Sequence, residues 1–84
     1  MAKKKIELTP AQALGKAIEQ VRESRGITRA QLAELLGVSP SNVWDYEHGK
    51  RLTCENQFAI AGALDAGWVE LVHLAESMQP KIPA

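Results

Sequence analysis

The sequence predicts an all-α protein in which five short helices surround one core. Apolar residues recur at intervals of three and four, helix-capping residues precede these stretches, and no segment alternates in the manner of a strand. Of the 84 residues, 45% are hydrophobic and 5% aromatic, which is enough for one domain with a mainly aliphatic core. We expect a flexible basic arm at 1–8, the folded domain at 9–78 and a tail at 79–84.

The first helix is predicted to begin at Pro10, because proline at the first helical position loses no helical hydrogen bond. Thr9 and Gln12 have the spacing of a capping box, and Gly26 provides the stop. The apolar positions of this helix form one buried stripe: Leu14, Ala17, Ile18 and Val21.

The second helix is predicted over residues 29–36. Thr28 and Gln31 form another capping-box pair, and Gly37 can adopt the left-handed conformation that ends a helix. Four apolar residues are expected to face the core: Leu32, Ala33, Leu35 and Leu36.

The third helix is predicted over residues 40–47, directly after a tight turn. Ser39 is its expected cap, and Pro40 occupies its first position. Val43 and Tyr46 are expected to point to the core, which leaves the polar residues outside. Two short helices in this arrangement are the sequence form of a helix-turn-helix, so the chain is a candidate DNA-binding protein.

The fourth helix is predicted at 54–65 after the cap Thr53, and the fifth at 68–78 after a short break. The apolar stripe of the fourth helix is Phe58, Ile60, Ala61 and Leu64. The fifth helix carries more apolar surface than a terminal helix of a small domain needs, which predicts a homodimer interface; the alternative is that it only covers the core. The interface residues would be Trp68, Leu71, Val72, Ala75 and Met78.

The formal net charge is zero, but the charges are distributed unevenly. Residues 1–26 contain six Lys or Arg against three Glu, and residues 53–84 contain one Lys against four acids. Residues 27–52 carry three charges of each sign. A phosphate backbone would be attracted to the basic end and repelled by the acidic one.

The single cysteine, Cys54, cannot form an internal disulfide, and no apolar run is long enough to span a bilayer. We therefore expect a soluble cytoplasmic protein with no membrane partner. His48 and His73 are far apart in sequence, no Cys/His cluster has metal-ligand spacing, and no glycine-rich phosphate loop occurs. No metal, cofactor or enzymatic activity is expected.

The chain also resembles a known family, the lambda repressor/Cro-like helix-turn-helix proteins, often called the Xre family, over about residues 10–74. The resemblance implies a DNA-binding domain of five helices whose third helix enters the major groove. It is carried by LGK at 14–16, RESRGIT at 22–28, LAELLGVS at 32–39, Val43, YEHGK at 46–50 and AGAL at 61–64.

The resemblance implies that Pro40, Ser41, Trp44 and Asp45 contact bases. An ionised Asp45 can only accept hydrogen bonds, so the N4 amine of cytosine is its natural partner, whereas Ser41 reads sequence weakly. Trp44 could pack on a thymine methyl or donate to a phosphate. The alternative is that Trp44 and Asp45 form a solvated face, or that Trp44 rests against a neighbouring helix.

Arg29 stands where the family usually carries glutamine, at a helix N-terminus that already favours anions, so it is expected to bind a DNA phosphate. The alternative is an exposed Arg29 paired with Glu34. The family also pairs the positions of Arg22 and Glu47 in a partly buried ion pair. The remaining residues expected at the DNA backbone are Lys3, Lys4 and Lys5 in an arm like that of phage repressors, and Thr28, Ser39, Asn42, His48, Lys50 and Arg51.

These features predict a sequence-specific regulator of transcription that binds double-stranded DNA as a homodimer and acts as a repressor. Two alternatives stay open. One is the DNA-binding antitoxin of a toxin–antitoxin pair, with a toxin as protein partner. The other is a protein-interaction module that keeps the fold without binding DNA, which the neutral charge and the presence of Pro40 and Asp45 favour.

Overall fold

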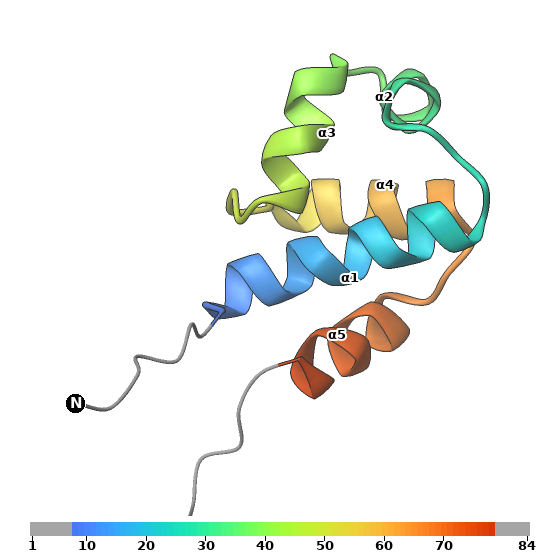
Figure 1. The fold of residues 1–84 in the computed structure, drawn as a ribbon. Helices are drawn as coiled ribbons and strands as arrows, with labels where there is room; N and C mark the ends of the chain where they lie inside the picture. Colours follow the sequence, from blue (N-terminus) through green and yellow to red (C-terminus); the bar gives the residue numbers. More distant parts are fainter. Residues whose placement is uncertain (1–7, 79–84) are drawn as a thin grey trace, which may run out of the picture.

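A computed structural model describes residues 8–78, and this part of the chain folds into five helices without a strand (Figure 1). The all-α prediction is confirmed; the bounds of the second and third helices are as predicted, and the fourth and fifth end one residue earlier. No single helix in the described part is long and apolar enough to cross a membrane. The helices are α1 (Pro10–Ser24), α2 (Arg29–Leu36), α3 (Pro40–Glu47), α4 (Cys54–Leu64) and α5 (Trp68–Ser77).

Local capping explains where the helices begin and end. The Thr9 hydroxyl accepts from the Gln12 backbone N–H at 3.1 Å, and the Gln12 side chain accepts from the Thr9 N–H at 3.0 Å. Thr28 and Gln31 make the same reciprocal pair at 3.1 and 2.9 Å. Gly37 ends α2 at a φ of 74°, in the left-handed region that glycine adopts without strain. Both predicted capping boxes and this stop are confirmed.

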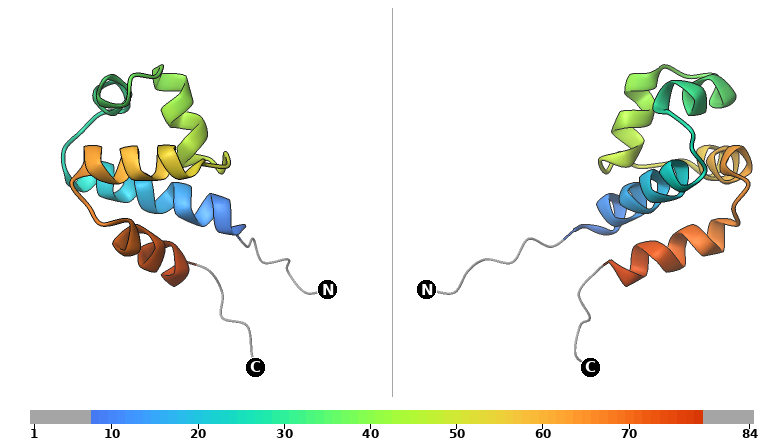
Figure 2. Two further views of the ribbon diagram at one scale, coloured as in Figure 1. Left: turned by 180° about the vertical axis from the view of Figure 1, so that it is seen from behind. Right: turned by 45° about the vertical axis from the view of Figure 1, so that its right-hand side comes forward.

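Helix α1 lies at the centre of the fold. Figures 1 and 2 show α5 on the opposite side of α1 from α3, while α2 packs against α3 and α4. Apart from Tyr46, the buried hydrophobic residues are aliphatic, as the composition predicts. They are Ala13, Ala17, Ile18, Leu32, Ala33, Val43, Tyr46, Ile60, Ala61, Leu64, Leu71 and Ala75.

Two residues predicted to lie in the core are instead exposed. Leu35 is 62% exposed and Phe58 is 73% exposed. The reason is helical geometry: residues two apart are separated by about 200° around the axis. Leu35 comes two residues after the buried Ala33, and Phe58 two residues before the buried Ile60, so each side chain is turned away from that buried neighbour.

The predicted interface on α5 is also wrong in part. Leu71 is completely buried and Ala75 is 7% exposed, because this side of α5 packs against α1. Trp68, Val72 and Met78 are half-buried, two of them against the same core. The apolar side of α5 therefore covers the protein's own core, which was the alternative considered.

The end of α3 lies close against α1 at Gly15. A Cβ atom on Gly15 would lie 2.5 Å from the carbonyl oxygen of Glu47 and 2.6 Å from that of Tyr46. Both neighbours are backbone atoms, which cannot move aside as a flexible side chain could. Gly15 therefore sets how deeply α3 sits on α1.

We predict that Gly15→Ala lowers the free energy of unfolding by about 1–3 kcal/mol, since an inserted methyl group must push two packed helices apart. The matched control is Gly62→Ala on α4, where a Cβ would meet nothing within 4 Å. This control should gain about 0.5–1 kcal/mol from better helix propensity. Urea denaturation of both variants measures the difference, and equal effects would contradict the packing argument.

Candidate nucleic-acid interface

Helix α3 turns one side to the core and the other outward. Val43 and Tyr46 are buried, as predicted, whereas Ser41 and Trp44 are exposed and Asp45 is half-buried. Positions 41, 44, 45 and 48 follow the spacing of a single helix face. The structure thus places three of the predicted base-contacting residues together, with exposed Pro40 at the start of the same helix.

The ring of Trp44 stacks on the ring of His48, one turn further along the chain. The ring centroids are 3.6 Å apart and the planes differ by 11°. His48 Nδ1 lies 2.7 Å from the Trp44 carbonyl oxygen, which can only accept, so Nδ1 carries the proton. Trp44 therefore packs on a ring at the end of its own helix and is 47% exposed. The sequence analysis missed this pair, although two rings four residues apart are a signal for it.

The hydroxyl groups predicted at the DNA backbone also cap helices. Thr28 accepts from Gln31, and the Ser39 hydroxyl accepts from the Asn42 N–H at 3.3 Å. An oxygen that accepts in a cap still has its O–H free to donate. Capping and a phosphate contact are therefore compatible at Thr28, whereas the Ser39 hydroxyl also shares a hydrogen bond of 3.1 Å with the Ser41 hydroxyl.

The loop after α3 carries cations. The Lys50 ammonium lies 5.6 Å from the centre of the Tyr46 ring, and the Lys50 backbone N–H donates to the Asp45 carbonyl at 3.0 Å. Arg51 is exposed and forms no ion pair with any residue between 8 and 78. The predicted arm contacts Lys3, Lys4 and Lys5 fall outside the described residues.

The predicted ion pair between Arg22 and Glu47 is confirmed. Arg22 Nε donates to Glu47 Oε2 at 2.6 Å, and the two residues are 6% and 2% exposed. Arg22 also donates through Nη1 to the Ile27 carbonyl at 2.7 Å, in the loop that leads to α2. The pair therefore joins α1, this loop and the C-terminal end of α3.

A second arginine binds the same carboxylate. Arg29 Nε donates to Glu47 Oε1 at 2.7 Å, and its Nη2 lies 3.3 Å from Glu19 Oε2. The hydrogen bond to Glu47 raises the pKa of Arg29 above its usual value, while burial opposes the rise. The alternative, that Arg29 is exposed and pairs with Glu34, is wrong. Glu47 lies 18 residues away in sequence, beyond the reach of local spacing rules.

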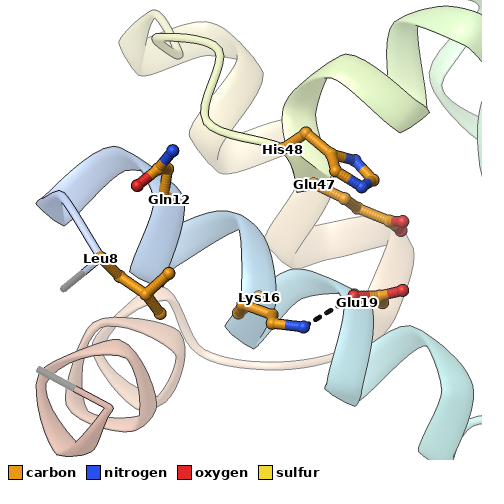
Figure 3. A pocket seen from close by; sticks show the side chains of 6 residues that line it. All are labelled: Leu8, Gln12, Lys16, Glu19, Glu47 and His48. Atoms are coloured by element: carbon orange, nitrogen blue, oxygen red, sulfur yellow. Dashed lines mark ion pairs between the residues drawn. The ribbon is translucent and has the colours of Figure 1, made fainter. Parts of the chain in front are cut away.

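A pocket of about 140 Å³ lies beside these ion pairs, between α1 and the end of α3 (Figure 3). Figure 3 shows Lys16 and Glu19 on one side and Glu47 and His48 on the other. Lys16 Nζ is 4.0 Å from Glu19 Oε1, and its side chain is 55% exposed. The structure thus adds Lys16, which the sequence analysis did not select, to the cations near α3.

Within residues 8–78 there is no group of three His, Cys, Asp or Glu side chains that could hold a metal ion.

This fold, with an exposed third helix after a tight turn, defines a helix-turn-helix domain. A family model described as a helix-turn-helix domain matches residues 13–67. Because the match covers more than half of the chain, the protein belongs to this family. The resemblance noted in the sequence is confirmed.

Individual relatives agree with this assignment. A protein of Methanospirillum hungatei JF-1, named as an HTH-type transcriptional regulatory protein, is 32% identical over an alignment of 73 residues that covers 82% of this chain and 24% of that protein. The chain thus spans about a quarter of that relative. The clp gene regulator ClgR from Corynebacterium glutamicum is 29% identical, with a TM-score of 0.87 over 92% of this chain and 100% of that one. The restriction-modification controller protein C.AhdI from Aeromonas hydrophila is 28% identical, with a TM-score of 0.68 over 74% and 94%.

We predict that Glu47→Gln lowers the free energy of unfolding by about 3–5 kcal/mol, because it leaves the buried Arg22 charge without its partner. The control is Glu34→Gln, which removes an equal charge from an exposed residue without an ion pair in the described chain. This control should change stability by less than about 0.5 kcal/mol. Chemical denaturation compares the two, and a small loss in Glu47→Gln would refute the structural role of the pair.

Proposed function

We propose that the protein is a sequence-specific DNA-binding regulator of transcription and acts as a repressor. The observation that carries this proposal is the outward face of α3, where Ser41, Trp44 and Asp45 are gathered while the opposite face is anchored in the core. The helix-turn-helix family and the regulators it resembles support the same conclusion. A repressor acts by occupying DNA, and this mode of action needs no catalytic site.

In this function α3 enters the major groove and the surrounding cations bind phosphates. The Asp45 carboxylate accepts from the N4 amine of a cytosine, and Trp44 packs on a thymine methyl. Lys50 and Arg51 in the loop meet the backbone, together with His48. Phosphate contacts position the helix without reading sequence, so specificity falls to the face of α3.

A protein-interaction module of the same fold is the second candidate, since the net charge of zero is unusual for a DNA-binding domain. Exposed Leu35 and Phe58 would then supply apolar contacts. The DNA-binding antitoxin of a toxin–antitoxin pair combines both properties, with a toxin as its protein partner.

The deciding experiment selects sequences bound by the protein from a random DNA duplex pool and repeats binding over a range of salt concentrations. We expect one enriched motif and an affinity that falls steeply with salt, with a log–log slope of about −0.9 per neutralised phosphate. Asp45→Ala should change the preferred base at one position, through the loss of about 1–3 kcal/mol of discrimination. Glu76→Ala on α5, on the opposite side of α1, removes an equal charge and should leave the motif unchanged.

Two results would count against this proposal. No enrichment combined with salt-insensitive retention would identify an interaction module. If Asp45→Ala tightened binding to every sequence equally, Asp45 would only repel the backbone and would not read a base.

We also propose that the protein acts as a homodimer. One helix-turn-helix reads few base pairs, and a second linked copy makes the second contact effectively intramolecular. Because Leu71 and Ala75 are buried, the large apolar side chains that α4 and α5 leave exposed are Phe58 and Val69. The operator of such a dimer is a palindrome whose half-sites are about 10 base pairs apart or a multiple of that.

We predict that the wild type sediments as a dimer and that Phe58→Glu shifts it to monomer without loss of helical content. A charge buried at an interface is costly, whereas Phe58 is already exposed within one copy. Gln20→Glu, which adds the same charge at an exposed position of α1, is the control. A wild type that stays monomeric and binds DNA as a single copy would rule out the dimer.

A further inference from the structure

Arginines from two helices bind one buried carboxylate at the end of α3. The Glu47 side chain is completely buried, and its two oxygens have different partners: Oε2 accepts from Arg22 at 2.6 Å and Oε1 from Arg29 at 2.7 Å. Arg22 comes from α1 and Arg29 is the first residue of α2. The orientation of the last turn of α3 is therefore fixed from two directions.

The two arginines differ in their surroundings. The Arg22 side chain is 7% exposed, so it belongs to the interior, whereas the Arg29 side chain is 36% exposed. Arg29 reaches inward all the same, since it also lies 3.3 Å from Glu19 on α1. Its guanidinium thus connects α1, α2 and α3 through two carboxylates.

We propose that Arg29 is a positioning residue for α3 and does not bind a DNA phosphate. By holding Oε1 of Glu47, it fixes the rotation of α3 and so the register of the residues that read bases. This inference rests on the proposed DNA-binding function.

The comparison of energies favours this role. For Arg29 to turn outward to a phosphate, Glu47 Oε1 would lose its partner while completely buried. A buried carboxylate oxygen that loses its donor cannot turn to water instead, whereas an ion pair at the surface is screened by solvent and contributes little. The contact with Glu47 therefore outweighs a contact with a phosphate at the surface.

A fixed carboxylate matters for reading bases because a binding site works only when its groups are held within about 0.5 Å of the productive geometry. With Arg22 alone, the carboxylate would be held through one oxygen and could rotate about that contact. The second charge-assisted hydrogen bond removes this freedom. Contacts to base edges need the most exact register of α3, so they depend most on this second hydrogen bond.

The test compares Arg29→Met with Arg51→Met, which removes the same charge from an exposed arginine that has no ion pair within residues 8–78. Affinity is measured for two duplexes of equal length, the selected sequence and a scrambled one, at several salt concentrations. Melting curves give the folded fraction, so each affinity is expressed per folded molecule. The wild type in the same assay reports separately on the proposed function.

Arg29→Met should leave the salt slope unchanged and reduce the ratio of specific to non-specific affinity about tenfold, the scale of one lost base contact. Arg51→Met should make the slope shallower by about 0.9 and weaken both duplexes alike, as the loss of one phosphate contact requires. Arg29→Lys keeps the charge but not the planar fork, so it should also lose discrimination.

Three results would overturn the inference while leaving DNA binding intact. A shallower slope in Arg29→Met would make Arg29 a phosphate contact, as would full discrimination in Arg29→Lys. A lower melting temperature with unchanged affinity per folded molecule would make it a structural residue only. By contrast, a wild type without salt-dependent binding would refute the proposed function itself.

Discussion

The buried carboxylate of Glu47 is the constraint on which the arrangement of the first three helices depends. A charge removed from water is costly unless its oxygens are occupied, and here each oxygen receives a guanidinium from a different helix. The requirement can be met only when α1, α2 and α3 are all in place. The same contacts that neutralise Glu47 therefore fix the helix whose outer face forms the candidate interface.

This dependence on tertiary contacts is strong because α2 and α3 are short. Each has eight residues, whereas isolated helices of fewer than about 12–15 residues are marginal in water. Their stability comes from burial of Leu32, Val43 and Tyr46, and from the close approach that Gly15 permits. The backbone of the last turn of α3 packs against α1 at Gly15, and the side chain of its final residue, Glu47, binds two arginines.

The ion pairs also reconcile a net charge of zero with a surface for phosphates. The acids Glu19, Glu23 and Glu47 are paired with cations of α1 and α2. Lys50 and Arg51 in the loop after α3 have no acidic partner among the described residues. The total charge is balanced, but the two cations of the loop after α3 remain available to phosphates, whose attraction extends over a Debye length of about 10 Å.

The sequence by itself determined the features that act over three or four residues. Both capping boxes, the glycine stop of α2 and the bounds of the helices follow from such local spacing, and family resemblance added the Arg22–Glu47 pair. Only the tertiary structure decided that Leu35 and Phe58 are exposed, that Leu71 belongs to the core, and that Arg29 binds Glu47. A cap needs only its own turn of helix, whereas burial and ion pairing join residues far apart in sequence and depend on how whole helices pack.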